Sequence, residues 1–370
     1  MGPAAEAVVT VMNERGAPTP VAWTRLRAVS EASKAELYRY LAHVAPYAGA
    51  PAAIEAFRGL EQVDVFIMYP HNRVSDVQRR QMTTVEGDNI HCIALEGTFD
   101  DCQGILKGLF NNHDFRDGLG LSGVNSINWA RVVAQIVYYF TSAVVLGAPH
   151  RKVSFTVPTG NFGDILAGYV AKRMGLPIER LVIATNENDI LARTLIDGVY
   201  EVRGVHATQS PSMDIQVSSN FERLLFDACG RDASVVRGLM SSLAQSGRFE
   251  MPVQMLTRIT EEFDAYRTGE TGTAKEMARV WKECGVLIDP HTAVAVHAAR
   301  KALAHDPATP MVALSTAHPA KFPDAVEGAM GTRPALPARM ADLFDRPERV
   351  TRVANDLAAI QSIIRERTGH

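Results

Sequence analysis

The stretch that decides the fold is VSFTVPTGNFGDILAGYVAKRMG, residues Val153 to Gly175. It begins with a short apolar run, 153–157, that is rich in β-branched residues and typical of a buried strand. A turn with two glycines follows at 158–164, and residues 165–174 are apolar at helical spacing. Strand, glycine turn and helix in this order form the repeating unit of an α/β protein.

The glycine turn has the properties of a phosphate site built from backbone. Gly160 and Gly163 permit positive φ and leave room for a ligand near the main chain. Because the turn opens a helix, free N–H groups and the positive end of the helix dipole face that ligand. Neither a nucleotide P-loop, which needs Gly-Lys-Ser/Thr, nor a Gly-x-Gly-x-x-Gly fingerprint is present here. A compact phosphate such as that of pyridoxal phosphate suits the turn, and a tight connection with purely geometric glycines is the alternative.

Composition and charge indicate an ordinary globular protein. The chain has 370 residues, of which 46% are hydrophobic and 21% charged, and its net charge is −3. These values give no reason to expect a nucleic acid or an anionic membrane as partner. The four cysteines form no Cys-x-x-Cys pair, and we expect no metal site. No apolar run approaches the ~20 residues of a transmembrane helix, and no signal peptide is recognisable at the N-terminus, so we expect a cytoplasmic protein.

Alternating helices and strands predict an α/β fold with two lobes, mainly parallel open sheets and a helical insertion. We expect helices at 4–14, 30–44, 52–60, 74–83, 99–110, 128–146, 165–174, 189–196, 220–228, 233–241, 255–263, 273–284, 292–303 and 354–367, and strands at 63–68, 90–95, 153–157, 181–185 and 311–315. The expected parts are a divergent helical segment, a smaller lobe, a larger lobe in two pieces, the helical insertion and a helical tail: 1–51, 52–120, 121–212 with 285–330, 213–284, and 331–370.

Polar clusters follow several expected strands, where ligands of open α/β sheets bind. They lie at 69–84, 121–131, 212–223 and 315–322. In the second cluster, a helix N-terminus with Arg131 one turn inside would hold a second anion, although a capped core helix explains the same residues. In the fourth, hydroxyl groups can hydrogen-bond a heteroaromatic nitrogen or simply cap a turn.

Taken in order, these motifs resemble threonine synthase of the longer, bacterial and fungal type. The segments that carry the resemblance are 69–84, 96–102, 122–131, 154–164, 212–224, 288–293 and 315–322, within a match from about Ala52 to Val326. Seven motifs in register are specific, whereas any single one is not. The resemblance implies the fold type II of pyridoxal-phosphate enzymes. It also implies the conversion of O-phospho-L-homoserine to L-threonine and phosphate, and it predicts no oligomeric state.

The resemblance also implies roles for individual residues. The loop that holds the phosphate of pyridoxal phosphate matches Gly160, Asn161, Phe162, Gly163 and Asp164.

Two further matches concern the cofactor ring and the substrate. Thr316 matches the hydroxyl residue that faces the pyridine nitrogen. The residues that bind the substrate phosphate match Asn125, Ser126 and Arg131.

The first fifty residues depart from the family. The family's cofactor-binding lysine lies in a His-Gly-Pro-Thr-Leu-Ala-Phe-Lys-Asp-like segment, and nothing here resembles it. Lys34 is the only lysine before Lys107, and it is a weak candidate. The family's loop for the substrate carboxylate is replaced by 45–51. Three interpretations follow: a threonine synthase with its first third replaced and little activity, a degenerate paralogue that binds pyridoxal phosphate or phosphate, and an active lyase that recruits Lys34. A sugar-phosphate or nucleotide binder is the alternative without pyridoxal phosphate.

Overall fold

The computed structural model describes residues 7–12, 54, 57–123, 126 and 128–369, and all structural statements below concern these residues. They form two compact units. One unit comprises the described residues up to Asn128 together with those from Leu336 onward, and the other runs from Trp129 to Ala335. Within this described part, no helix is long and apolar enough to cross a membrane.

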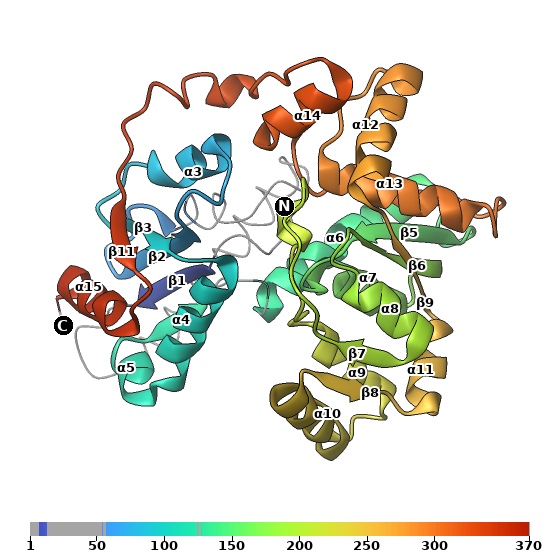
Figure 1. Ribbon diagram of the computed structural model, residues 1–370, viewed down its shortest axis with the longest axis horizontal. Coiled ribbons are helices and arrows are strands. Elements are labelled where there is room, and N and C mark those ends of the chain that lie inside the picture. The colour runs from blue at the N-terminus through green and yellow to red at the C-terminus, as the bar shows by residue number, and fades with distance from the viewer. Residues whose placement is uncertain (1–6, 13–53, 55–56, 124–125, 127, 370) are drawn as a thin grey trace. The chain divides into compact units, whose positions relative to one another are not determined.

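The first unit is built on a mixed five-stranded sheet (Figure 1). Its strands, in spatial order, are β11 (Thr351–Ala354), β3 (Ile90–Glu96), β2 (Val63–Pro70), β1 (Ala7–Met12) and β4 (Leu121–Gly123). The strands β11, β3 and β2 are parallel, whereas β1 is antiparallel to both of its neighbours. The helices of this unit are α3 (Asp76–Thr83), α4 (Phe99–Asn111), α5 (His113–Gly118) and α15 (Leu357–Thr368).

Helices cover both faces of this sheet, because alternate side chains of β2 belong to two different apolar clusters. Phe66 and Met68 belong to the apolar cluster that includes residues of α4 and α15. Val65 and Ile67 belong to the other cluster, which includes Met82 of α3. Because successive side chains of a strand point to opposite faces, the apolar run 65–69 of β2 follows from burial on both sides.

The structure corrects the prediction for the N-terminal segment. We expected a helix at 4–14, but residues Ala7–Met12 form β1, which pairs with β2 and β4. The helix prediction is wrong because a short apolar run cannot be assigned by periodicity alone. Its four consecutive β-branched residues, 8–11, favour a strand. The helix expected at 30–44 lies outside the described residues.

The second unit is built on a four-stranded parallel sheet. Its strands, in spatial order, are β10 (Met311–Ala313), β5 (Val153–Pro158), β6 (Ile178–Thr185) and β9 (Phe263–Arg267). The short strands β7 (Val199–Glu201) and β8 (Arg248–Glu250) form a separate antiparallel pair. The helices are α6 (Trp129–Val145), α7 (Gly163–Arg173), α8 (Ile190–Asp197), α9 (Phe221–Ala228), α10 (Ala233–Ser246), α11 (Val253–Thr260), α12 (Glu270–Cys284), α13 (Pro290–Leu303) and α14 (Pro323–Met330).

The parallel sheet of this unit is also covered on both faces (Figure 1). The helix α13 packs against all four strands on one face, where Val182 and Ala184 of β6 contribute to its apolar cluster. Leu181 and Ile183 belong instead to the largest cluster, which includes Ile165 of α7. The mainly parallel α/β architecture expected from the sequence is therefore confirmed.

The segment 213–284, which we expected to be mainly helical, also contains strands. It contains the four predicted helices, but β9 follows α11 within it and forms one edge of the central sheet. The helix expected at 255–263 ends at Thr260, and Phe263 already begins the strand. The tail, 331–370, likewise supplies β11 in addition to its helix. The division of the chain into five parts stays a prediction.

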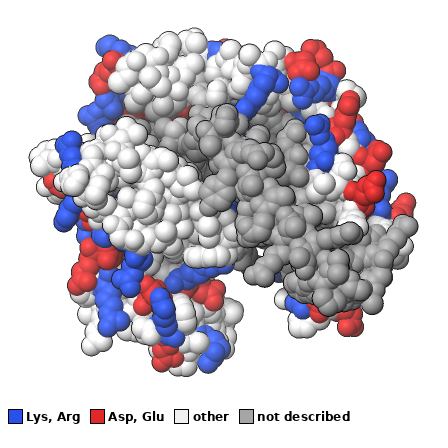
Figure 2. All heavy atoms as spheres, turned by 180° about the vertical axis from the view of Figure 1, so that it is seen from behind, with Lys and Arg blue, Asp and Glu red and all other residues white. Residues whose placement is uncertain are grey.

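On the face shown in Figure 2, lysine and arginine side chains lie among those of aspartate and glutamate. Exposed pairs such as Arg346 with Asp342, at 2.7 Å, contribute to this mixing. Pairs of this kind contribute little to stability, so the fold depends on the apolar clusters.

A close helix contact in the second unit yields a stability prediction. A Cβ added at Gly168 of α7 would lie 2.6 Å from Cε1 of Tyr139 and 2.9 Å from Cδ2 of Leu181. The variant Gly168→Ala should therefore lower the free energy of unfolding by about 1–3 kcal/mol, because the core there is already filled. The matched control is Gly238→Ala in α10, where a Cβ meets nothing within 4 Å. This change should raise stability by about 0.5–1 kcal/mol, and chemical denaturation measures both. Equal effects of the two substitutions would contradict the packing described here.

Candidate functional site

The turn between β5 and α7 presents a row of backbone N–H groups. Phe162 precedes the helix with φ 62°, and no side chain caps the helix. The first helical hydrogen bond runs from Leu166 N to Phe162 O, at 3.1 Å. Among the residues that the structure describes, the N–H groups of Gly160, Asn161 and Phe162 donate no hydrogen bond, although all three residues are buried. Buried donors without acceptors at a helix N-terminus form a site for an anion.

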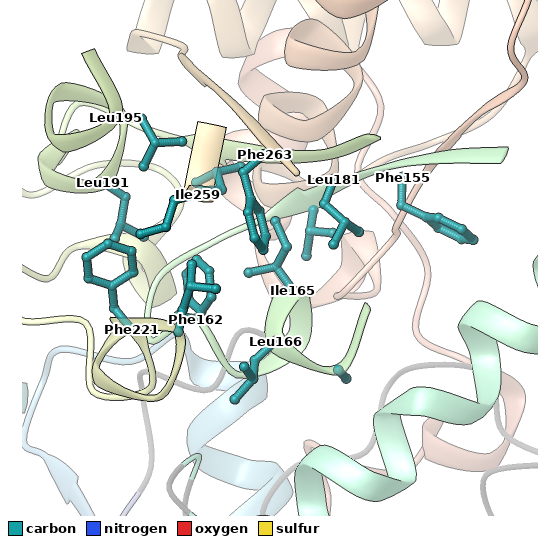
Figure 3. Close-up of a cluster of buried hydrophobic side chains, with 14 of the residues drawn as sticks. Phe155, Phe162, Ile165, Leu166, Leu181, Leu191, Leu195, Phe221, Ile259 and Phe263 are labelled. Carbon is teal, nitrogen blue, oxygen red and sulfur yellow. The ribbon is translucent and has the colours of Figure 1, made fainter. Parts of the chain in front are cut away.

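The side chain of Phe162 explains why this turn holds its strained shape. It is 1% exposed and lies in the apolar cluster of Figure 3 beside Phe221, with ring centroids 5.4 Å apart. A positive φ is unusual for a bulky residue, and packing in the core stabilises it here. Phe162 can therefore contribute to a ligand only through its backbone.

A second segment, Ser212 to Asn220, packs against the turn and donates hydrogen bonds to its carbonyl groups. Gly160 needs to lack a side chain because a Cβ there would lie 2.6 Å from the carbonyl oxygen of Ser212. The Ser218 hydroxyl donates to Gly160 O at 2.7 Å. Both the backbone N–H and the side-chain amide of Asn220 donate to Asn161 O, at 3.0 and 2.9 Å. The carbonyl groups of the turn are thus engaged, which leaves its N–H groups facing the other way.

Thr316 lies at the same edge of the sheet. The strands β10 and β5 are parallel neighbours, and Leu314 N donates to Thr156 O at 3.0 Å as β10 ends. Thr316 and Gly160 both follow the carboxyl ends of these strands. The Thr316 hydroxyl is buried, and it has no hydrogen-bond partner among the described residues. A buried hydroxyl without a partner is costly, so its presence beside the turn points to a ligand group that it contacts.

The Asp164 carboxyl is directed toward two tyrosines of α6. The Tyr138 hydroxyl bonds to its Oδ1, and the Tyr139 hydroxyl donates to the Asp164 backbone carbonyl at 2.9 Å. Burial raises the pKa of Asp164, while the tyrosine hydroxyls and the positive charge of Arg131 oppose that shift. The carboxyl therefore does not compete with an anion for the N–H groups of the turn.

The expected substrate-binding residues are distributed over both units. Arg131 lies in the first turn of α6, in the second unit, where its charge acts on Asp164. Ser126 is buried and belongs to the first unit, and Asn125 lies outside the described residues. The helix begins at Trp129, so Asn128 is the residue directly before it. The site that the three residues form together stays a prediction.

Two lysines bear on the missing lysine motif, one outside the described residues and one within them. Lys34 and the loop at 45–51 lie outside the described residues. Lys321 is 4% exposed and follows Thr316 by five residues, and the sequence alone gave no reason to single it out. A buried lysine is rare unless it is paired, and nothing in the local sequence separates it from a surface lysine.

The sequence pattern also gave no signal for several residues around the candidate site. Tyr138 and Tyr139 look like ordinary apolar positions of a helix, because their partner Asp164 lies 25 or more residues away. Asp289 and His291 were noted only as part of a motif, without a role. Both are buried, and His291 Nδ1 lies 2.7 Å from Asp289 Oδ2.

Solved structures share this fold. The crystal structure of pyridoxal-phosphate-bound threonine synthase from Brucella melitensis is 57% identical in sequence, with a TM-score of 0.81 over 86% of this chain and 68% of that one. Yeast threonine synthase is 38% identical, with a TM-score of 0.75 over 86% of this chain and 68% of that one. The fold and the glycine turn therefore define the fold type II class of pyridoxal-phosphate enzymes.

Proteins of similar sequence identify one family within that class. The family described as "Threonine synthase, C-terminal" matches residues 292–364. Threonine synthase of Pseudomonas aeruginosa is 54% identical over 314 residues, which cover 85% of this chain and 67% of the relative. That of Eremothecium gossypii is 47% identical over 340 residues, 85% of this chain and 66% of the relative. The chain belongs to the threonine synthase family. It spans 66–68% of the length of these two relatives and of the two crystallised proteins.

The environment of Asp164 yields a prediction for the pH dependence of stability. Because its folded-state pKa is raised above the ordinary value of 3.8, the folded chain binds more protons than the unfolded chain just above that pH. The parent chain then loses stability as pH rises through this window. The variant Asp164→Asn has no such loss, so its free energy of unfolding relative to the parent should increase from about pH 4 upward and then level off.

The control for this experiment is Asp232→Asn. Asp232 caps α10, and its hydrogen bonds from Ser234 lower its pKa. Its stabilising effect is present above the unfolded pKa and is lost as pH falls. The stability of Asp232→Asn relative to the parent should therefore decrease as pH rises. Denaturation across a pH series measures both, and slopes of the same sign would contradict the described burial of Asp164.

Proposed function

We propose that the turn at 160–164 binds the phosphate of pyridoxal 5′-phosphate through its backbone N–H groups. The observation that carries this proposal is the row of N–H groups in the three buried residues 160–162, at the same sheet edge as the Thr316 hydroxyl; within the described part of the chain, none of these groups has a hydrogen-bond partner. Oriented amides at a helix N-terminus stabilise a compact dianion without a cation. The pyridoxal phosphate bound in the Brucella melitensis relative supports the choice of ligand.

The Thr316 hydroxyl is the proposed partner of the pyridine nitrogen. A hydroxyl leaves that nitrogen largely unprotonated, in contrast to an aspartate partner. When bound, pyridoxal phosphate supplies an aldehyde and an electron sink for reactions at the carbon atoms of an amino acid. The chain supplies the fixed positions: the phosphate against 160–164 and the ring nitrogen against Thr316.

The proposed substrate is O-phospho-L-homoserine, converted to L-threonine and phosphate by β,γ-elimination and addition of water. The names of the relatives support this activity. Asn125, Ser126 and Arg131 are the proposed ligands of the substrate phosphate. A guanidinium group binds a phosphate dianion with two parallel, charge-assisted hydrogen bonds, so Arg131 would contribute most of the affinity. A cytoplasmic location belongs to the same proposal.

Turnover by this chain is proposed to be strongly impaired. A lysine normally activates the cofactor aldehyde and then moves protons between substrate carbons. The printed sequence has no segment that resembles the family's lysine motif, and Lys34 is its only lysine before Lys107. The second candidate function is therefore a catalytically impaired paralogue that binds pyridoxal phosphate or phosphate.

Thr316→Val separates ligand binding from stability. Valine has the same shape but lacks the hydroxyl group, which has no partner among the described residues. The ligand-free variant should be as stable as the parent or more stable by about 1 kcal/mol, while its affinity for pyridoxal phosphate should fall about three- to tenfold. Denaturation and equilibrium dialysis measure the two effects.

The matched control is Thr194→Val. The Thr194 hydroxyl is buried and donates to Ile190 O at 2.6 Å, remote in sequence from the turn. This variant should lose stability and keep its affinity. If Thr316→Val binds pyridoxal phosphate as tightly as the parent, the proposed role of Thr316 is wrong.

A trapping experiment tests the proposed impairment. The parent chain is incubated with pyridoxal phosphate and reduced with borohydride, and peptide mapping then locates any modified lysine. With O-phospho-L-homoserine, phosphate release should be slower by orders of magnitude than for the Pseudomonas aeruginosa relative, because the usual lysine motif is missing. Modification of Lys34 or Lys321 together with phosphate release at the relative's rate would contradict the impairment. A sugar-phosphate or nucleotide binder would show no saturable binding of pyridoxal phosphate at all.

A further inference from the structure

A chain of hydrogen bonds between buried polar residues lies near the sheet edge that carries the proposed site. At its centre is Asp289, the residue that caps α13. Asp289 and His291 are 0% and 1% exposed, and the Asp289 carboxylate accepts hydrogen bonds from the backbone N–H groups of His291 and Thr292. These two bonds alone would account for an ordinary helix cap. The side chains of the same residues make further contacts that a cap does not require.

One arm of the chain passes through the imidazole ring of His291. The backbone N–H of Ser212 points at Nε2 of His291, with a distance of 3.3 Å. A backbone N–H can only donate, so Nε2 must be the acceptor and carries no proton. The ring proton is then on Nδ1, which donates to Asp289 Oδ2 at 2.7 Å. The geometry thus fixes a neutral imidazole in a single tautomer.

The other arm passes through hydroxyl groups. The Thr292 hydroxyl bonds to Asp289 Oδ1 and must donate, because a carboxylate only accepts. Its oxygen then accepts from the Ser315 hydroxyl, with 3.1 Å between the oxygens. The pKa of Asp289 is lowered because the contacts to His291 and Thr292 outweigh the opposite effect of burial. The charged carboxylate therefore sets the direction of the hydrogen bonds through the Thr292 hydroxyl, and it is consistent with the tautomer that the Ser212 N–H assigns to His291.

The two arms end at the two parts of the proposed cofactor site. The first arm ends at Ser212, and the carbonyl oxygen of this same residue would lie 2.6 Å from a Cβ on Gly160, so Ser212 lies against the phosphate turn. The Ser315 end is the residue before Thr316, whose hydroxyl is the proposed partner of the ring nitrogen. All of these residues belong to the second unit.

We infer that Asp289 and His291 are positioning residues that hold the phosphate turn and the Thr316 loop in register with each other. This inference rests on the proposed function, because the register matters only if one ligand spans both loops. A ligand of fixed length needs its two contact points held to within a fraction of an ångström, which side chains locked by further hydrogen bonds achieve.

The test uses two substitutions of His291 that each keep one of its bonds. His291→Gln keeps a terminal oxygen near the Nε2 position, which can accept from Ser212 N. His291→Asn keeps only a group near the Nδ1 position, and it leaves the buried Ser212 N–H without an acceptor. We expect affinity for pyridoxal phosphate to fall about tenfold in His291→Asn and to remain within about threefold of the parent in His291→Gln.

A ligand-free measurement keeps the test independent of the proposed function. In the full chain without ligand, amide hydrogen exchange followed by mass spectrometry reports opening of peptides that cover 158–166. Exchange there should be faster in His291→Asn than in the parent and near the parent rate in His291→Gln. If the parent chain fails to bind pyridoxal phosphate, the proposed function is wrong, while this exchange pattern still supports or overturns the positioning role.

The control is Asp232→Ala, which removes the side-chain cap of α10 without touching the hydrogen bonds from Ser212 to Ser315. Its melting temperature should fall while exchange at 158–166 and affinity stay at parent values. The inference is overturned if His291→Asn behaves like this control, with lower global stability but unchanged local exchange and affinity. It is also overturned if glutamine and asparagine at position 291 have the same effect.

Discussion

The structure of the second unit depends on one constraint: backbone N–H groups are buried at the start of α7 without acceptors in the described chain. Each such group costs on the order of 1–3 kcal/mol when nothing binds it. The surrounding residues maintain the arrangement. Phe162 is anchored in the core, and the Ser218 and Asn220 side chains engage the carbonyl groups of the turn. A ligand that accepts from these N–H groups would recover the cost, which is why we propose a small anion as the ligand of the turn.

The parallel sheet explains why the two proposed contact points for the ligand lie at the same sheet edge. Because β5 and β10 are parallel neighbours, the loops that follow them emerge at the same edge. Thr316 comes from one loop and the glycine turn from the other. The polar chain centred on Asp289 joins the supports of the two loops through α13, the helix that packs across the whole sheet. The parallel sheet thus brings the two loops to the same edge, and we infer that a few buried polar residues hold these loops in position relative to each other.

Local sequence was sufficient for the turn but not for its supports. The strand, glycines and helix between Val153 and Met174 are contiguous, so their pattern predicted this strand, turn and helix directly. The residues that back it are remote in sequence: Ser218 lies 58 residues from Gly160, and His291 lies 79 residues from Ser212. Such partners become visible only when the chain is folded. The seven ordered motifs nevertheless identified the family, because they report the whole arrangement at once.

The errors in the sequence prediction have the same origin. A short apolar run fits a helix or a strand equally well, and tertiary pairing decided in favour of strands for β1 and β9. At β9, the end of α11 and the start of the strand are separated by two residues, which periodicity could not resolve. The unpartnered state of the Thr316 hydroxyl has no sequence signal, since it depends on what is absent around the side chain.

The most direct test of the account observes the N–H groups of the turn themselves. In a chain labelled with ¹⁵N-glycine, the amide resonances of Gly160 and Gly163 are followed during titration with pyridoxal phosphate and with pyridoxal. The account predicts large, saturable shifts of both resonances with pyridoxal phosphate and small ones with pyridoxal, because the phosphate accepts from the turn. Saturable binding of pyridoxal phosphate that leaves both resonances in place would contradict it.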